Sequence, residues 1–307
     1  MSDFLNSTDL KSMKRAMFII NPVSGKKLAL RHVPKIIRTL MDAGYVVTTL
    51  VTGKRGDATA YAANYGDEFD LIVCTGGDGT LNETLAGLAS NDIDVPLGYI
   101  PAGSTNDFAL CHGLSTDVLT AAQDAAFGTV ERYDIGKFGD SQYFSYVAAF
   151  GAFSWLSYTT PQEAKNVLGH SAYLFDAVKD LPKLRAEHVR LTDSAGIVHE
   201  GDYLFGAVCN STSIAGTIEL PSDVVDTCDG LFEVFLVKEP HNIIELESIV
   251  HGILTQDYSS PHIEFFQSRS VLIDNPPGLY WSLDGEKSEY REHIKIELLD
   301  GFLQLKS

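Results

Sequence analysis

Short runs of hydrophobic residues alternate with helical periodicity over the first 130 positions. The runs predict strands at residues 17–20, 45–51, 71–74 and 95–100. Between them, hydrophobic residues recur every three or four positions, which predicts helices over residues 28–41, 57–65 and 81–88. Strands and helices that alternate in this way form a parallel sheet with helices on both faces. We therefore expect a doubly wound α/β domain over residues 14–132.

The pattern changes after residue 130, where strand-like runs follow one another with few helices between them. Turns of Gly, Asp and Pro join the runs, and this spacing is typical of an antiparallel β-sandwich. We expect that domain over residues 133–307, with one helix over 242–253 and a helical insert over 161–181. The expected strands cover residues 132–138, 143–150, 189–192, 203–209, 231–237, 263–266, 270–273, 279–283 and 294–298.

A last hairpin is expected at the end of the chain. Residues 302–305 should pair with residues 294–298, because Asp300-Gly301 between them is a hairpin turn signal. The sequence leaves open whether this hairpin packs on the first domain.

Composition places the chain among globular proteins, with 45% hydrophobic and 21% charged residues. No stretch reaches the roughly 20 consecutive hydrophobic residues of a membrane-spanning helix, so we expect a soluble, intracellular protein. The four cysteines form no CxxC pair, which favours reduced structural thiols. The net charge of −18 argues against nucleic acid as a bulk partner.

Charge is unevenly distributed along the chain. Residues 1–55 carry ten Lys or Arg and three Asp, a net charge of +7, and the remainder carries −25. A basic region on an acidic protein indicates a local anion site, such as nucleotide phosphates or an anionic membrane surface. An ordinary solvated helix face explains any single lysine equally well.

The sequence Gly76-Gly77-Asp78-Gly79-Thr80 follows a predicted buried strand and precedes a helix. Backbone N–H groups and the helix dipole can hold phosphate at such a junction. The loop does not match GxxxxGK[ST], because it lacks the Lys-Ser/Thr pair. It does not match GxGxxG either, because Asn82 occupies the position of the third glycine. A carboxylate at position 78 indicates a bridging cation or the handling of a hydroxyl proton. The alternative is a tight turn in which Asp78 caps the helix.

Three polar loops follow predicted parallel strands: Asn21–Lys27, Gly76–Thr80 and Pro101–Asp107. Ligands of open α/β sheets bind outside the carboxyl ends of the strands, where the strand order reverses. We therefore expect the three loops to meet at one edge of the sheet. Their convergence is stronger evidence for a site than any single motif.

Four motifs occur in order: Asn21-Pro-Val-Ser-Gly25, Gly76-Gly-Asp-Gly-Thr80, Pro101-Ala-Gly-Ser-Thr-Asn-Asp107 and Asp284-Gly-Glu286. With them, residues 16–305 resemble the diacylglycerol kinase catalytic-domain family, most closely its soluble bacterial lipid kinases and more distantly the sphingosine and ceramide kinases. NAD kinases and phosphofructokinases carry similar GGDGT loops. The first, third and fourth motifs make the resemblance specific.

The resemblance implies an ATP site that spans the three loops. Small hydroxyls and exposed backbone N–H groups there suit phosphate. Lys26 and Arg31 match basic family positions and could neutralise phosphate charge, although both could also be solvated helix residues. The implied ATP-binding residues are Asn21, Pro22, Val23, Ser24, Gly25, Lys26, Arg31, Thr52, Gly76, Gly77, Asp78, Gly79, Thr80, Leu81, Asn82, Glu83 and Ser104.

The resemblance assigns the role of proton acceptor to Glu286. A carboxylate suits this role because the alcohol loses its proton as the P–O bond forms. Asp78 would hold a catalytic Mg²⁺ or orient the hydroxyl, and distant relatives use the equivalent residue as the base, so the division between the two stays open. Asp107 is a third catalytic candidate, with a helix cap or loop brace as its alternative role.

A second cation site is implied at the acidic turn Asp226-Thr-Cys-Asp229-Gly-Leu231. The resemblance assigns a structural Mg²⁺ to Asp226, Asp229 and the carbonyl of Leu231, and oxygen ligands of this kind suit a hard cation. A solvated Asp-Gly turn is the alternative. Lys165 matches a family lysine on the helical insert, which could meet the membrane. Leu110 departs from the family, many of whose members have Arg there.

The principal hypothesis is an ATP- and Mg²⁺-dependent kinase that phosphorylates diacylglycerol at an anionic membrane surface. The implied localisation is cytoplasmic and peripheral to the inner face of the membrane. Undecaprenol or a sphingoid base could replace diacylglycerol as the lipid alcohol. An NAD kinase is a second hypothesis, and a nucleotide-binding regulator without catalysis is a third. The acyl chain is not predicted, and a homodimer is left open.

Overall fold

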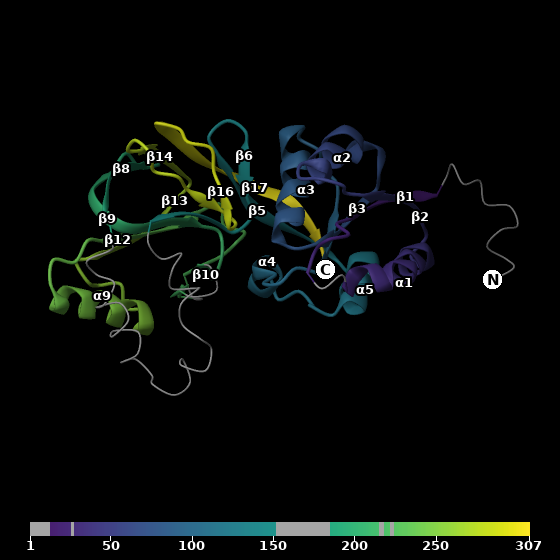
Figure 1. Cartoon of the computed structure of the whole chain (residues 1–307), viewed down its shortest axis with the longest axis horizontal. Coiled ribbons are helices and arrows are strands. Elements are labelled where there is room, and N and C mark those ends of the chain that lie inside the picture. The colour runs from purple at the N-terminus through teal and green to yellow at the C-terminus, as the bar shows by residue number, and fades with distance from the viewer. Residues whose placement is uncertain (1–12, 26–27, 152–184, 215–217, 222–223) are drawn as a thin grey trace, which may run out of the picture. The chain divides into compact units, whose positions relative to one another are not determined.

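The computed structural model describes residues 13–25, 28–151, 185–214, 218–221 and 224–307. The chain divides into two compact units, which comprise residues 1–134 with 301–307, and residues 135–300 (Figure 1). The predicted helical insert over 161–181 and its Lys165 lie outside the described residues, as does Lys26. No helix in the described part of the chain is long and apolar enough to span a membrane.

The first unit is a doubly wound α/β structure, which confirms the predicted fold class. Its strands are β1 (Lys14–Ile20), β2 (Tyr45–Val51), β3 (Leu71–Gly76) and β4 (Leu97–Pro101), all parallel in the order β4-β3-β1-β2. Its α-helices are α1 (Leu28–Asp42), α2 (Asp57–Tyr65), α3 (Asp78–Ser90), α4 (Asp107–Cys111) and α5 (Val118–Phe127). Helices α1 and α5 cover one face of the sheet and α2 and α3 the other (Figure 1).

The central strands β1 and β3 are buried almost throughout, because both faces of the sheet are covered, and every second side chain enters the same core. Phe18 of β1 and Val73 of β3 join Ile36 of α1 in one hydrophobic cluster. Four buried alanines of α5 complete the cluster, and their small side chains let the helix approach the sheet closely. A Cβ on Gly98 of β4 would lie 2.5 Å from the Cβ of Ala125. The hydrophobic pattern of the sequence did not predict α5.

The second unit is built from antiparallel strands. They are β5 (Val130–Phe138), which begins in the first unit, β6 (Gln142–Phe144), β7 (Val147–Gly151), β8 (Glu187–Asp193), β9 (Val198–Cys209), β10 (Ser213–Ile214), β11 (Ile218–Glu219), β12 (Phe232–Lys238), β13 (Ile263–Ser268), β14 (Ser270–Asp274), β15 (Ser282–Leu283), β16 (Glu286–Lys287) and β17 (His293–Lys306). Helix α9 (Ile243–Thr255) is the predicted helix of this half.

Strand β9 joins the two layers of the second unit. Its first half pairs with β8, and its second half lies between β12 and β7. Side chains from both sets of strands form one core around the buried Trp281, whose ring lies 4.8 Å from that of Phe150 and 5.8 Å from that of Phe138. This shared core is the interior of the predicted β-sandwich.

The expected hairpin at Asp300-Gly301 is wrong, because β17 is one continuous strand from His293 to Lys306. A tight hairpin turn of this type needs positive φ at both central residues, and only Gly301 has it, at 56°. The N–H of Gly301 donates to Oδ1 of Asp134 at 2.6 Å. The chain therefore passes straight on, and Leu305 pairs in parallel with Leu97 of β4.

His112 links the stability of the first unit to pH. Its ring packs against Phe108 and Tyr133, with centroid distances of 4.3 and 4.6 Å. Its buried Nε2 has no hydrogen-bond partner in the described part of the chain. Burial lowers the pKa of His112 from 6.5 to about 4, because desolvation disfavours the charged imidazolium. The unfolded chain therefore takes up this proton at a higher pH than the folded chain does.

We expect His112 to lower the free energy of unfolding by about 3 kcal/mol as the pH falls from 6.5 to 4. Its contribution is fully present above pH 6.5, where the residue is neutral in both states. His112→Phe keeps a ring at this position and cannot titrate, so the variant should lose less stability over the same range. Urea unfolding of both proteins at several pH values measures the difference. Parallel pH profiles would contradict this assignment.

Candidate active site

Three loops meet at the carboxyl ends of β1, β3 and β4, as predicted. Strand β1 lies between β2 and β3, so the strand order reverses beside β1. This is the position at which open α/β sheets bind ligands. The amide N–H of Asn21 donates to the carbonyl of Thr75 at 3.0 Å, and that of Ala102 donates to Gly76 at 2.7 Å. These backbone bonds join neighbouring loops where their strands end.

Asn21 connects the first loop to helix α3. Its Nδ2 donates to the Oγ1 of Thr80 at 2.9 Å, and its Oδ1 accepts from the N–H of Val23 at 3.1 Å. The hydroxyl of Ser24 donates to the carbonyl of Asn21 at 3.1 Å. The side chain of Asn21 therefore holds the shape of its own loop and fixes the loop to the first turn of α3.

Glycines allow the backbones of the three loops to approach one another. A Cβ on Gly25, which has φ of 49°, would lie 2.3 Å from the carbonyl oxygen of Ala102. A Cβ on Gly103 would lie 2.6 Å from the Cα of Gly77. Both distances are far below van der Waals contact with backbone atoms, so only glycine fits. The glycines of the motifs therefore hold the loops together in addition to leaving room for a ligand.

Gly103→Ala is expected to lower the free energy of unfolding by about 2 kcal/mol, because its Cβ forces the second and third loops apart. Gly53→Ala is a matched control, since its Cβ would meet only the Oδ2 of Asp57, at 3.6 Å. Thermal unfolding of the two variants beside the wild type measures the effect. Equal melting temperatures for the two variants would contradict the close approach of the loops.

Asp78 has a different structural role from the predicted cap. Helix α3 begins at Asp78 itself, with Gly77 as its N-cap, and no side chain caps it. The Asp78 carboxylate instead accepts N–H bonds from Asp107 at 3.1 Å and from Phe108 at 3.3 Å, at the first turn of α4. The interpretation that Asp78 caps its own helix is therefore wrong, since its side chain binds the third loop.

Asp107 lies beside Asp78 and is half-buried. Burial raises the pKa of Asp107, and the negative charge of Asp78 raises it further. Neighbouring carboxylates of this kind do not ionise independently. The pair can share a proton or a cation, which is chemistry that catalytic sites commonly use.

The other predicted nucleotide residues lie on the same loops or beside them. Thr52 follows β2, and its N–H donates to the carbonyl of Ile20 at 2.9 Å. The carboxylate of Glu83 on α3 accepts from the N–H of Gly56 at 2.9 Å and so holds the loop after β2. Ser104 is exposed in the third loop, and Arg31 is exposed on α1.

The sequence analysis gave no role to two residues of this region, Tyr99 and Asn106. The hydroxyl of Tyr99 on β4 donates to the carbonyl of Gly76 at 3.3 Å. Asn106 has φ of 54°, and its side chain accepts from the N–H of Gly103 at 2.8 Å. The preference of Asn for left-handed turns is the signal that could have identified its bracing role.

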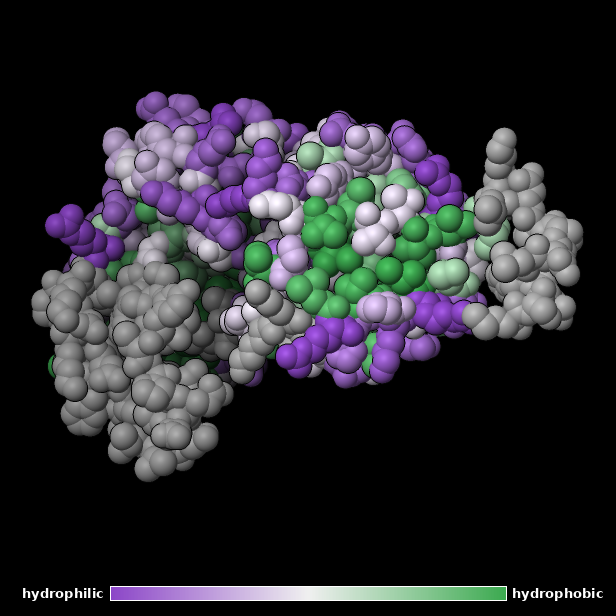
Figure 2. All heavy atoms as spheres, turned by 45° about the vertical axis from the view of Figure 1, so that its right-hand side comes forward, coloured by the Kyte–Doolittle hydropathy of each residue, from purple (hydrophilic) through white to green (hydrophobic). Residues whose placement is uncertain are grey.

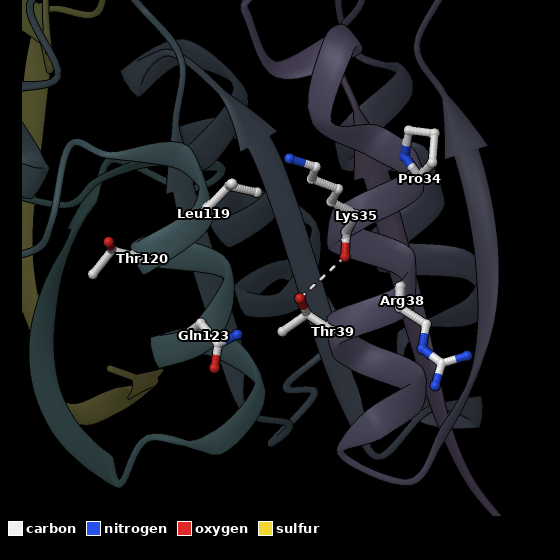
Figure 3. A pocket seen from close by; sticks show the side chains of 7 residues that line it. All are labelled: Pro34, Lys35, Arg38, Thr39, Leu119, Thr120 and Gln123. Atoms are coloured by element: carbon white, nitrogen blue, oxygen red, sulfur yellow. Dashed lines mark hydrogen bonds between the residues drawn. The ribbon is translucent and has the colours of Figure 1, made fainter. Parts of the chain in front are cut away.

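A groove between α1 and α5 is separate from these loops. It has a volume of about 570 Å³, and none of its lining residues belongs to the three loops. Figure 3 shows the side chain of Lys35 extending toward Leu119 and that of Arg38 pointing away from α5. The lining residues are Pro34, Lys35, Arg38, Thr39, Leu119, Thr120 and Gln123.

Glu286 belongs to the second unit and follows a tight hairpin turn. Asp284 and Gly285 form the turn between β15 and β16, with φ of 49° and 86°. The buried Asp284 carboxylate accepts from the N–H and the hydroxyl of Ser145 at 2.6 and 2.8 Å. It also accepts from the N–H groups of Tyr146 and Val147 at 3.1 and 3.0 Å. Four hydrogen bonds therefore fix the turn that carries the exposed Glu286.

The second acidic site is a surface loop before β12. Asp226 accepts from the N–H of Cys228 at 3.0 Å, and Asp229 accepts from the N–H of Leu231 at 2.9 Å, each through Oδ1. Both aspartates are exposed, and neither of these two hydrogen bonds uses an Oδ2 atom. In the described part of the chain, no three His, Cys, Asp or Glu side chains are close enough to hold a metal ion.

Glu233 lies directly after this loop and was not predicted. The residue is fully buried, and Nε2 of Gln267 bonds both its Oε1, at 3.1 Å, and the carbonyl of Val224, at 3.3 Å. Burial raises the pKa of Glu233 to about 7, and the charges of Asp229 and Asp226 contribute in the same direction. The buried carboxyl group of Glu233 therefore adds a third acidic residue to this region of the chain.

Comparisons with known proteins identify relatives over most of the chain. The diacylglycerol kinase catalytic domain model matches residues 15–138. Diacylglycerol kinases of Bacillus subtilis and Staphylococcus saprophyticus are each 34% identical to this chain, over 89% of it and 90% and 89% of their own lengths. A crystal structure of a diacylglycerol kinase from Bacillus anthracis covers 96% of this chain and 97% of its own, with a TM-score of 0.73 and 25% identity.

The fold, with one α/β unit and one β unit, agrees with that of the Bacillus anthracis structure. The Gly-Gly-Asp-Gly-Thr loop lies within the matched catalytic domain. The identity extends well beyond that domain into the second unit. The chain therefore belongs to the diacylglycerol kinase family and is a lipid kinase.

Proposed function

We propose that this protein transfers the γ-phosphate of ATP to the hydroxyl group of diacylglycerol and so forms phosphatidic acid. The observation that carries the proposal is the convergence of three glycine-containing loops at the carboxyl ends of β1, β3 and β4. The names of the relatives support diacylglycerol as the acceptor. The hydroxyl oxygen attacks the γ-phosphorus, ADP leaves, and the hydroxyl proton passes to a carboxylate.

The three loops are proposed to hold the triphosphate. The first N–H groups of α3 lie at the positive end of the helix dipole, which favours phosphate. Gly77 and Gly79 place no side chain between these groups and a phosphate. Asn21, Thr52 and Ser104 lie on these loops or beside them and are proposed to complete the phosphate site. Lys26 and Arg31 would add positive charge near the phosphates.

Asp78 and Asp107 are proposed to serve a catalytic Mg²⁺ beside the phosphates. Adjacent carboxylate oxygens match the ligand preference of this ion. Burial and then the charge of Asp78 raise the pKa of Asp107, and a cation would offset the repulsion between the two carboxylates. When bound, Mg²⁺ would neutralise charge on the phosphate oxygens. The hydrogen bonds from α4 hold the Asp78 carboxylate in a fixed orientation for this role.

Glu286 is proposed as the general base, and Asp226, Asp229 and the carbonyl of Leu231 as ligands of a structural Mg²⁺. Each aspartate uses one oxygen to hold its own turn, and the other can serve a cation. The expectation that Glu286 faces the loops of the first unit stays a prediction. So do the membrane contact through the insert with Lys165 and the peripheral cytoplasmic location.

A lipid-extract assay tests the proposal. The protein is supplied with ATP, Mg²⁺ and a panel of acceptors, which are mixed micelles of diacylglycerol, undecaprenol or a sphingoid base, and NAD in solution. The products are identified by mass spectrometry. Phosphatidic acid is the expected product, and chelation of Mg²⁺ should abolish it. Phosphorylated undecaprenol or sphingoid base would reassign the acceptor, and phosphorylated NAD would reassign the enzyme. Binding of ATP with no product across this panel would favour a regulatory protein.

A further inference from the structure

Tyr99 is a buried tyrosine near the carboxyl end of β4. The first unit presents a continuous hydrophobic area in the view of Figure 2, but Tyr99 is only 3% exposed and adds almost nothing to that surface. A buried tyrosine hydroxyl usually has a hydrogen-bond partner, and that of Tyr99 donates to the carbonyl oxygen of Gly76 at 3.3 Å. Its ring lies 6.0 Å from that of Phe108 in an edge-to-face arrangement. This packing holds the hydroxyl in place beside the second loop.

The peptide between Gly76 and Gly77 has little conformational restraint of its own. A Cβ on Gly76 would lie 2.3 Å from Oγ1 of Thr80, and a Cβ on Gly77 would lie 3.2 Å from the Cα of Gly103. Both positions therefore favour glycine. Because glycine restricts the backbone least of all residues, the peptide between two glycines can flip more easily than its neighbours. Contacts from outside the loop have to fix its orientation.

The carbonyl of Gly76 points toward β4, because it also accepts from the N–H of Ala102 at 2.7 Å. The C=O and N–H groups of a planar trans peptide point in opposite directions. Strand β3 lies between β4 and β1, so the N–H of Gly77 points toward the side of β1, which the first loop follows. Among the described residues, no backbone carbonyl accepts this N–H. A ligand between the first and second loops can therefore accept it.

We propose that Tyr99 is a positioning residue for nucleotide binding, whose hydroxyl holds the Gly76–Gly77 peptide so that the N–H of Gly77 faces a phosphate of ATP. The inference rests on the ATP site of the proposed function. A flipped peptide would direct the carbonyl oxygen of Gly76 toward the phosphate in place of an N–H. Two oxygen atoms that both carry negative charge repel one another, whereas a backbone N–H binds phosphate. The orientation of this one peptide therefore decides whether the loop attracts or repels the nucleotide there.

The two donors to the Gly76 carbonyl set the size of the effect. Without the hydroxyl of Tyr99, the N–H of Ala102 still bonds the carbonyl, so the peptide is held less firmly but keeps its preferred orientation. A binding-competent orientation that is populated for less of the time lowers the apparent affinity by that fraction. One neutral hydrogen bond changes an equilibrium about fivefold. The loss of the hydroxyl is therefore expected to weaken ATP binding by up to about fivefold.

Tyr99→Phe tests the proposal, because it removes the hydroxyl and keeps the ring that packs against Phe108. Calorimetric titration of the full chain with ATP and Mg²⁺ should show a dissociation constant about fivefold above that of wild type. Adenosine, measured as a competitor of ATP, has no phosphate and should bind both proteins equally. Tyr203→Phe is the matched control, since Tyr203 is buried in the second unit and its hydroxyl donates to Oε1 of Glu264 at 3.1 Å. That variant should bind ATP as wild type does.

Hydrogen exchange followed by mass spectrometry provides an independent measurement, after circular dichroism has shown that each variant is folded. ATP should slow the exchange of residues 76–80 in wild type and slow it less in Tyr99→Phe. Equal ATP affinity of these two proteins overturns the role of Tyr99 and leaves the ATP site intact. An equal loss of affinity for ATP and adenosine also overturns it, because the hydroxyl would then support the whole site. A wild type that binds no ATP overturns the proposed function together with this inference.

Discussion

Glu286→Gln is expected to lower kcat for phosphoryl transfer to diacylglycerol by about a thousandfold, while ATP binding is retained. A positioned general base contributes about 10²- to 10⁴-fold to the rate, and glutamine keeps the size of the side chain without its basicity. Glu286 is exposed at the start of β16, so the substitution should leave the free energy of unfolding unchanged. Steady-state kinetics in mixed micelles and thermal unfolding measure the two quantities.

Glu292→Gln is the matched control for Glu286→Gln. Glu292 is an exposed glutamate six residues further along the chain, and it belongs to none of the four motifs. Its variant should turn over at the wild-type rate. If Glu286→Gln and Glu292→Gln were equally active, Glu286 would not be the base, and the role would pass to Asp78 or Asp107. The substitutions Asp78→Asn and Asp107→Asn would then separate these two.

Asp284→Asn should destabilise the second unit by about 3 kcal/mol. The Asp284 carboxylate is 5% exposed and accepts four hydrogen bonds, three of them from backbone N–H groups. Asparagine keeps one acceptor oxygen and turns an N–H₂ group toward donors, so buried donors lose their partners. Buried donors without partners cost about 1–3 kcal/mol each, and bonds to charged groups are the stronger ones.

Urea unfolding followed by tryptophan fluorescence measures this change, because Trp281 is buried in the core of the second unit. Asp300→Asn is the control, since the contact of Asp300 with Arg269 is long, at 3.6 Å, and exposed and should contribute little. Asp284→Asn should also lower kcat, because the turn that it fixes carries Glu286. A variant as stable as wild type would show that the four hydrogen bonds do not hold the turn.

Local pattern was sufficient to predict most elements of the first unit. The predicted bounds of β2 and α2 are those observed. The hydrophobic residues of each element are close together in the sequence, so their spacing alone predicted where the strand and the helix begin and end. The three loops were predicted to meet, since parallel strands place their carboxyl ends at one edge. Helix α5 was missed because its buried face is made of alanines, which carry little hydrophobic signal.

The two Asp-Gly pairs show the limit of local pattern most clearly. Asp284-Gly285 and Asp300-Gly301 both carry the signal of a tight hairpin turn, yet only the first forms one. At the first, N–H groups from residues 145–147 surround the aspartate and hold it at positive φ. At the second, Asp134 binds the glycine amide and β17 continues. Partners more than 130 residues away decide between the two outcomes.

By itself the sequence determined most of the strands and helices of the first unit and the family, and it supplied the candidate site residues, because each of these depends on a short local pattern of residues. Only the tertiary structure decided that residues 301–307 return to the first unit and that Asp78 binds α4 in place of capping α3. These features depend on contacts between residues that lie far apart in the sequence, and no local pattern of hydrophobic and polar residues records such contacts.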